Sequence, residues 1–247
     1  MDDIEELPLY EGCLAYVQRN WLSTTKADRL FEDIKRQIPF GEYQIKMGAK
    51  IYDVPRGIFA FGDDGICTND VNGEIVEGTG HVYGRPKKKY LSFAWDTPIE
   101  VLQNDILVPD DCSQPLSFHH ASDQPPGPND VPVGKRIRRI MQHLNQNSHA
   151  QFNAVLINEY RTGKDSISKH SDQEVVEPYN EVYGISLGES RIIHFVSLDG
   201  KDKHEIELRH GDLMVMSGDT QKYYTHEIRK RVNKGLRISL TFRALPM

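Results

Sequence analysis

The sequence alternates strictly between polar and apolar residues in Arg237-Ile-Ser-Leu-Thr-Phe-Arg243. Successive side chains of a β-strand point to opposite faces, so this run predicts a strand with one apolar face. The other face would carry two arginines and two hydroxyl groups. Because an unpaired buried charge is costly, a cationic face inside a β core requires an anionic partner. The alternative is a solvent-facing edge strand with two ordinary arginines.

Short apolar or alternating runs, separated by turn residues, fill the chain from residue 152 to this strand. Such runs at short intervals are typical of an all-β sandwich or barrel. They lie at 155–157, 182–187, 192–198, 206–208, 213–216, 225–228 and 238–242.

Two helices are predicted upstream of the β region. Apolar residues recur at helical spacing in 26–37, after possible caps at Ser23 and Thr24, and again in 133–146. Prolines in 103–130 indicate a long loop or insertion between the helices. We therefore expect an α+β protein that is mainly β, with a helical and mixed half over 21–150 and a β core over 151–247.

The charge of the chain is unevenly distributed. The chain carries 30 basic and 36 acidic residues, a net charge of −6. Residues 1–20 form an acidic leader, and the remainder, 21–247, is expected to be a single domain. The total argues at first against a polyanionic partner, but it belongs largely to the leader.

The sequence also indicates where in the cell the protein is found and whether it contacts a membrane. The three cysteines lie far apart, which indicates neither a disulfide framework nor a thiolate zinc site. The sequence has no basic signal peptide and no long apolar stretch. We expect a protein that is not secreted, contacts no membrane and is intracellular, in the nucleus or cytoplasm.

Metal binding is the chemistry best supported by short motifs, since the Gly-rich stretch 78–84 lacks GxGxxG spacing and no reactive cysteine setting can be named. His170-Ser-Asp172 places an imidazole and a carboxylate on one side of an extended segment, where both can bind one ion. A second pair, His210-Gly-Asp212, resembles a hairpin turn and is expected to be structural. His226 lies in another alternating run. Two histidines and one carboxylate on one face leave three open positions, as in non-haem Fe(II) sites that bind a cosubstrate and O₂. The alternative is three unrelated surface residues.

Taken together, these segments resemble the AlkB family of Fe(II)- and 2-oxoglutarate-dependent dioxygenases. The similarity is closest to the branch that repairs alkylated nucleic-acid bases. Its specific segments are 158–165, 170–174, 185–188, 210–216, residue 226 and 237–243. A weaker similarity lies in Val54-Pro-Arg56 and Phe61-Gly-Asp63.

The resemblance implies a double-stranded β-helix, or jelly roll, with N-terminal helices and a nucleotide-recognition lid. It implies that His170, Asp172 and His226 hold Fe(II). It also implies that Arg237 binds the distal carboxylate of 2-oxoglutarate and that Arg243 lies near the carboxylate that chelates the metal. The complete set implied for 2-oxoglutarate is Asn158, Tyr160, Arg237, Thr241 and Arg243.

The activity implied by the resemblance is oxidative demethylation of N-alkylated bases in DNA or RNA, of the 1-methyladenine or 3-methylcytosine type. O₂ and 2-oxoglutarate would be consumed, and formaldehyde, succinate and CO₂ released. Basic residues at 85–89 and 229–231 could follow a phosphate backbone. The alternatives are the same iron chemistry on a protein or small molecule, and a binding module without turnover.

The sequence departs from the family pattern near the expected substrate. Ser239 stands where familiar members have Asn, and Gln173 follows the metal-binding carboxylate where the family has another acid. An aromatic wedge for base flipping is not evident in 45–50. The candidate substrate-binding residues are Met47, Arg56, Tyr83, Gln173 and Glu174.

Overall fold

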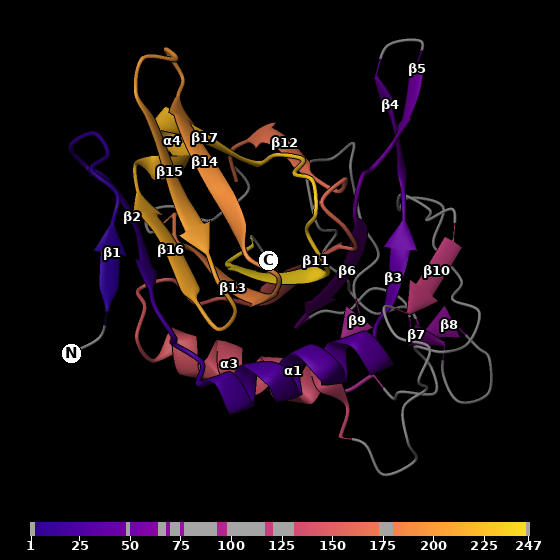
Figure 1. Ribbon diagram of the computed structural model, residues 1–247. Helices are drawn as coiled ribbons and strands as arrows, with labels where there is room; N and C mark the ends of the chain where they lie inside the picture. Colours follow the sequence, from indigo (N-terminus) through magenta and orange to yellow (C-terminus); the bar gives the residue numbers. More distant parts are fainter. Residues whose placement is uncertain are drawn as a thin grey trace.

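Two antiparallel sheets dominate the computed structural model, which describes residues 3–47, 50–63, 68–69, 75–76, 93–97, 117–120, 131–172 and 180–245 (Figure 1). The larger sheet has ten strands. Its order is β1 (Ile4–Glu6), β2 (Cys13–Gln18), β16 (Leu213–Gly218), β13 (Val182–Gly188), β18 (Arg237–Arg243), β11 (Ala154–Tyr160), β6 (Gly57–Gly62), β3 (Pro39–Glu42) and β10 (Ser117–His120). β9 (Phe93–Ala94) also pairs with β6.

The smaller sheet has four strands and supplies the metal-binding candidates. Its order is β12 (Ile167–His170), β17 (Tyr224–Ile228), β14 (Arg191–Ser197) and β15 (Lys203–Leu208). Two separate ribbons pair β4 (Gln44–Met47) with β5 (Lys50–Asp53) and β7 (Thr68–Asn69) with β8 (Ile75–Val76). The antiparallel sheets form a jelly-roll-type core.

Each face of the larger sheet is covered by a different partner. On one face, Ile238, Leu240 and Phe242 pack in a core with residues of α1 (Thr24–Gln37) and α3 (Val133–Asn145), which lie side by side along the sheet (Figure 1). On the other face, apolar residues of β13 and β16 pack against those of β14, β15 and β17. The alternation seen in the sequence therefore separates a helix-facing surface from a sheet-facing surface.

β18 lies in the middle of the larger sheet, between β13 and β11. Its arginines are almost fully buried, with 2% of Arg237 and 5% of Arg243 exposed. The alternative of an exposed edge strand is therefore wrong.

The N-terminal segment differs from the expectation of a separate acidic leader. β2 pairs with β16, and β1 pairs with β2, so both extend the larger sheet. Ala15 and Val17 are fully buried, whereas Glu5 and Glu6 remain exposed. Leu7 is also buried, but three separated apolar positions are too few to signal a core strand against the acidic composition.

The helices occupy the two segments with helical spacing. Ser23 is the residue before α1, but its side chain makes no capping hydrogen bond. No helix in the described ranges has the length and apolar character needed to cross a membrane.

Candidate metal and dicarboxylate site

His170, Asp172 and His226 meet at the end of the smaller sheet. His170 ends β12 and is the register partner of His226 in β17, with ring centroids 4.3 Å apart. Asp172 follows two residues after His170. Each of the three offers one ligand atom, and these atoms lie within 4.8 Å of one another. Two imidazoles and one carboxylate at this spacing can bind one divalent ion.

The histidines are held in the neutral form that metal binding requires. Burial, with the neighbouring His170, lowers the pKa of His226 to about 3. Burial likewise lowers the pKa of His170. The ring of His170 is oriented by its Nδ1, which lies 2.8 Å from the carbonyl oxygen of Ser168. A hydrogen bond of this kind leaves Nε2 available as the ligand.

Asp172 is kept ionised although it is buried. Burial by itself raises its pKa, but the positive charge and hydrogen bond of Arg243 oppose that effect, and the pKa lies below its ordinary value. Arg243 Nη2 donates to Asp172 Oδ1 over 2.6 Å. The other oxygen, Oδ2, is buried without a hydrogen-bond partner among the described residues. This donor set fits a divalent metal ion.

A cavity extends from these residues between the two sheets. Its volume of about 70 Å³ is several times the roughly 10–15 Å³ that one water molecule needs. All five residues implied for 2-oxoglutarate line it. The polar lining residues are Asn158, Tyr160, His170, Asp172, Ser186, His226, Arg237, Ser239, Thr241 and Arg243.

Arg237 gives one end of the cavity an unbalanced positive charge. Its Nη2 donates to Ser186 Oγ over 2.9 Å, and its guanidinium carbon lies 5.1 Å from the ring centre of Tyr160. Nε and Nη1 have no hydrogen-bond partner among the described residues. A buried guanidinium with two unpartnered nitrogens fits a carboxylate as its ligand.

The candidate substrate residues are only partly described. Arg56 contacts the lining of the cavity, because its Nε donates to Asn158 Oδ1 over 2.8 Å. Met47 lies in the β4 ribbon, but its side chain is outside the description. Tyr83, Gln173 and Glu174 also lie outside the described residues, as do 85–89 and, apart from β10, the loop 103–130.

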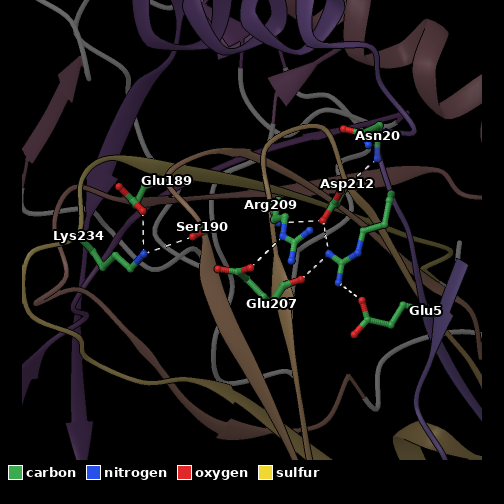
Figure 2. A network of polar contacts seen from close by, with 9 residues as sticks. Glu5, Asn20, Glu189, Ser190, Glu207, Arg209, Asp212 and Lys234 are labelled. Carbon is green, nitrogen blue, oxygen red and sulfur yellow. Dashed lines mark hydrogen bonds and ion pairs between the residues drawn. The ribbon is translucent and has the colours of Figure 1, made fainter. Parts of the chain in front are cut away.

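The second His-x-Asp pair is structural, as expected, but the predicted hairpin is wrong, because its turn connects β15 in the smaller sheet to β16 in the larger sheet. Asp212 accepts from Arg19 and from the backbone N–H groups of Asn20 and Arg209 (Figure 2). His210 instead accepts from the backbone N–H of Gly188 and faces Asp28. The two side chains therefore have separate partners within the protein and do not bind a shared ion.

Two residues near the site are missed by motif reading. Gln221 accepts a hydrogen bond from the backbone N–H of Asp172, and Arg191 is buried beside Tyr160. Gln221 has no distinguishing sequence context. Arg191, at the head of the run 192–198, could have been found as the one charge leading into an apolar strand.

Comparison with known proteins supplies the wider context of this site. The family described as 2OG-Fe(II) oxygenase superfamily matches residues 14–243. The chain is 32% identical over 117 residues to the uncharacterized protein R406 of Acanthamoeba polyphaga mimivirus, covering 47% of this chain and 61% of that protein.

Two further relatives have descriptive names. The chain is 34% identical over 127 residues to the DNA oxidative demethylase ALKBH2 of Mus musculus, covering 47% of this chain and 51% of that protein. It is 29% identical over 131 residues to the alpha-ketoglutarate-dependent dioxygenase alkB homolog 3 of Homo sapiens, covering 49% and 45% respectively. The chain thus spans about half the length of these two relatives.

Proposed function

The chain belongs to the 2OG-Fe(II) oxygenase superfamily as an AlkB-type dioxygenase, and from this premise we propose that it demethylates N-alkylated bases in DNA or RNA. The overall reaction consumes 2-oxoglutarate and O₂ and yields succinate, CO₂, formaldehyde and the unmodified base. The observation that carries the proposal is a cationic cavity that leads directly to the His170, Asp172 and His226 cluster.

In this proposal the charged residues, histidines and Tyr160 of the cavity bind and position the reactants. His170, Asp172 and His226 hold Fe(II), which supplies the oxidising chemistry when 2-oxoglutarate and O₂ are bound. Arg237 and Tyr160 bind the distal carboxylate of the cosubstrate. Arg243 keeps Asp172 ionised and oriented through their 2.6 Å hydrogen bond. The residues of the two sheets exclude bulk water around these groups.

Surface charge supports a nucleic-acid substrate. The basic segment 229–231 starts three residues after His226 and is exposed. Arg229 is paired with Glu227 over 2.8 Å, whereas Lys230 and Arg231 form no ion pair with the described residues. Exposed lysine and arginine beside a catalytic cavity are suited to binding phosphates of a nucleic-acid backbone. A base in a duplex would have to be flipped out to reach the metal.

The decisive experiment supplies methylated nucleic acid to the reconstituted enzyme. The protein is loaded anaerobically with Fe(II) and 2-oxoglutarate and then exposed to O₂ with oligonucleotides carrying 1-methyladenine or 3-methylcytosine. Single- and double-stranded DNA and RNA are compared. We expect formaldehyde and succinate in equal amounts with at least one methylated oligonucleotide.

Two controls separate the parts of the proposal. His170→Ala should produce neither formaldehyde nor succinate while retaining the circular dichroism of the parent. Unmethylated oligonucleotides should release no formaldehyde. Turnover of 2-oxoglutarate with no formaldehyde from any methylated oligonucleotide would contradict the substrate assignment and favour a protein or small-molecule substrate.

A further inference from the structure

Tyr160 lies between two buried arginines, only one of which lines the cavity. The guanidinium carbon of Arg237 is 5.1 Å from the centre of the Tyr160 ring, and that of Arg191 is 5.7 Å from it. Arg237 is the cross-strand neighbour of Tyr160 in the larger sheet, whereas Arg191 begins β14 in the smaller sheet. The ring therefore connects a cavity-lining cation with a cation outside the cavity.

Arg191 is buried without a carboxylate bound to it among the described residues. Only 1% of it is exposed, and its Nη2 donates to the backbone carbonyl oxygens of Asp165 and Arg229. Its Nε and Nη1 have no hydrogen-bond partner among the described residues. Carbonyl groups provide partial negative charge only, so the guanidinium is solvated but not neutralised.

The carboxylates nearest to Arg191 are paired with other basic residues. Asp165 Oδ2 accepts from the backbone N–H and the Nε of Arg161. Glu189 is paired with Lys234 over 2.8 Å. Burial lowers the pKa of both Arg191 and Arg237, as expected for charges held away from water. Arginine nevertheless remains protonated, so one positive charge lines this end of the cavity and a second lies behind the Tyr160 ring.

A buried surplus of positive charge favours a ligand that brings negative charge to the same place. The proposed cosubstrate has a second carboxylate that would lie against Arg237 and Tyr160. We propose that Arg191 is a positioning residue that makes the cavity selective for a dicarboxylate, by holding the Tyr160 ring and adding a second positive charge behind it. This inference rests on the proposed function, because it assigns the distal carboxylate to this end of the cavity.

The proposal predicts a difference between two ligands rather than a general loss of binding. 2-Oxoglutarate and 2-oxovalerate share the metal-chelating end, but 2-oxovalerate lacks the distal carboxylate. Affinities are measured by isothermal titration of the Mn(II)-loaded protein without O₂, so no turnover occurs. Arg191→Gln removes the charge but retains an N–H donor. It should weaken the binding of 2-oxoglutarate about tenfold and leave the affinity for 2-oxovalerate unchanged.

Matched variants separate charge from packing. Arg191→Lys, which keeps the charge, should preserve the preference for 2-oxoglutarate to within about threefold. Arg209→Gln, which alters an exposed arginine paired with Glu207, should change neither affinity. Should Arg191→Gln fail to fold, Arg191→Lys decides by itself, because loss of the preference in that variant overturns the electrostatic role.

The remaining outcomes are also decisive. If Arg191→Gln lowers the affinity for both ligands equally, Arg191 only maintains the fold. If neither affinity changes, Arg191 has no role in ligand binding. Arg237→Gln is measured in parallel. If Arg237→Gln weakens the binding of 2-oxoglutarate and Arg191→Gln does not, the inference about Arg191 fails while the proposed cosubstrate site stands. If Arg237→Gln also has no effect, the proposed cosubstrate site fails with it.

Discussion

At the scale of single residues, burial decides which ion pairs contribute to stability. Asp212 is 1% exposed and lies 2.5 Å from Arg19, which is itself buried. Arg209 and Glu207, only a few residues away in sequence, form an exposed pair at 2.8 Å (Figure 2). Removing one partner of a buried pair leaves a charge without compensation, whereas an exposed pair is replaced by water.

We therefore expect Arg19→Met to lower the free energy of unfolding by about 3–5 kcal/mol. The matched variant Arg209→Met should lower it by less than about 1 kcal/mol. Both values are measured by urea unfolding. Adding Asp212→Asn to Arg19→Met should recover part of the loss, because it removes the orphaned charge. Equal effects of the two single substitutions would show that burial of this pair has no energetic consequence.

At the scale of secondary-structure elements, a short helix connects the N-terminal strand to the metal-binding segment. α4 (Thr220–Tyr223) directly precedes β17 and therefore His226. The Thr220 hydroxyl accepts from the backbone N–H of Leu14 in β2, and its one proton can be donated to the carbonyl oxygen of either Ser217 or Leu14. Gln221 Oε1 accepts from the backbone N–H of Asp172 over 2.8 Å. One turn of helix thus anchors the segments that carry two of the three metal-binding candidates.

Gln221→Met keeps the side-chain volume but removes the acceptor for the Asp172 N–H. We expect metal affinity to fall by about tenfold or more, as is typical when partners of metal ligands are removed. Mn(II) titration measures the affinity, and the absorption spectrum of the Co(II)-loaded protein reports the ligand geometry. Lys222→Met, on the exposed side of the same turn, is the control. An unaltered affinity and spectrum in Gln221→Met would contradict the positioning role.

At the scale of the whole molecule, the candidate site joins the two sheets. β12 and β17 of the smaller sheet provide the histidines, while β11 and β18 of the larger sheet provide Tyr160 and the arginines. A ligand that bridges them binds only the folded arrangement. Ligand binding should therefore stabilise the complete fold by mass action.

Thermal unfolding tests this linkage. When 2-oxoglutarate is added at about 100 times its dissociation constant to protein already saturated with Mn(II), the additional stabilisation should be about 2.7 kcal/mol. For a chain of this length, that corresponds to a rise in Tm of about 5–10 °C. In His170→Ala, most of this ligand-induced rise in Tm should be lost. The same rise in His170→Ala as in the parent would mean that the ligands act elsewhere.

A feature can be predicted from the sequence when it depends on neighbouring residues, and not when it depends on residues far apart in the sequence. The two faces of β18 could be predicted because alternation is a local property of one strand. The burial of Arg191 could not, because it depends on carbonyl groups of Asp165 and Arg229, which are distant in sequence. The role of residues 4–18 was also hidden, since their acidic composition outweighs the three buried apolar positions Leu7, Ala15 and Val17.

The sequence by itself determined the AlkB-type family, the mainly β class, and the order of the candidate iron and 2-oxoglutarate residues. These are properties of local alternation and of side-chain chemistry at fixed spacings. Only the tertiary structure decided that β18 is central, that Asp172 is paired with Arg243 while Asp212 is paired with Arg19, and that a second arginine lies behind Tyr160. The physical reason is that burial and charge pairing arise between strands far apart in sequence, whose contacts are set by the packing of the two sheets.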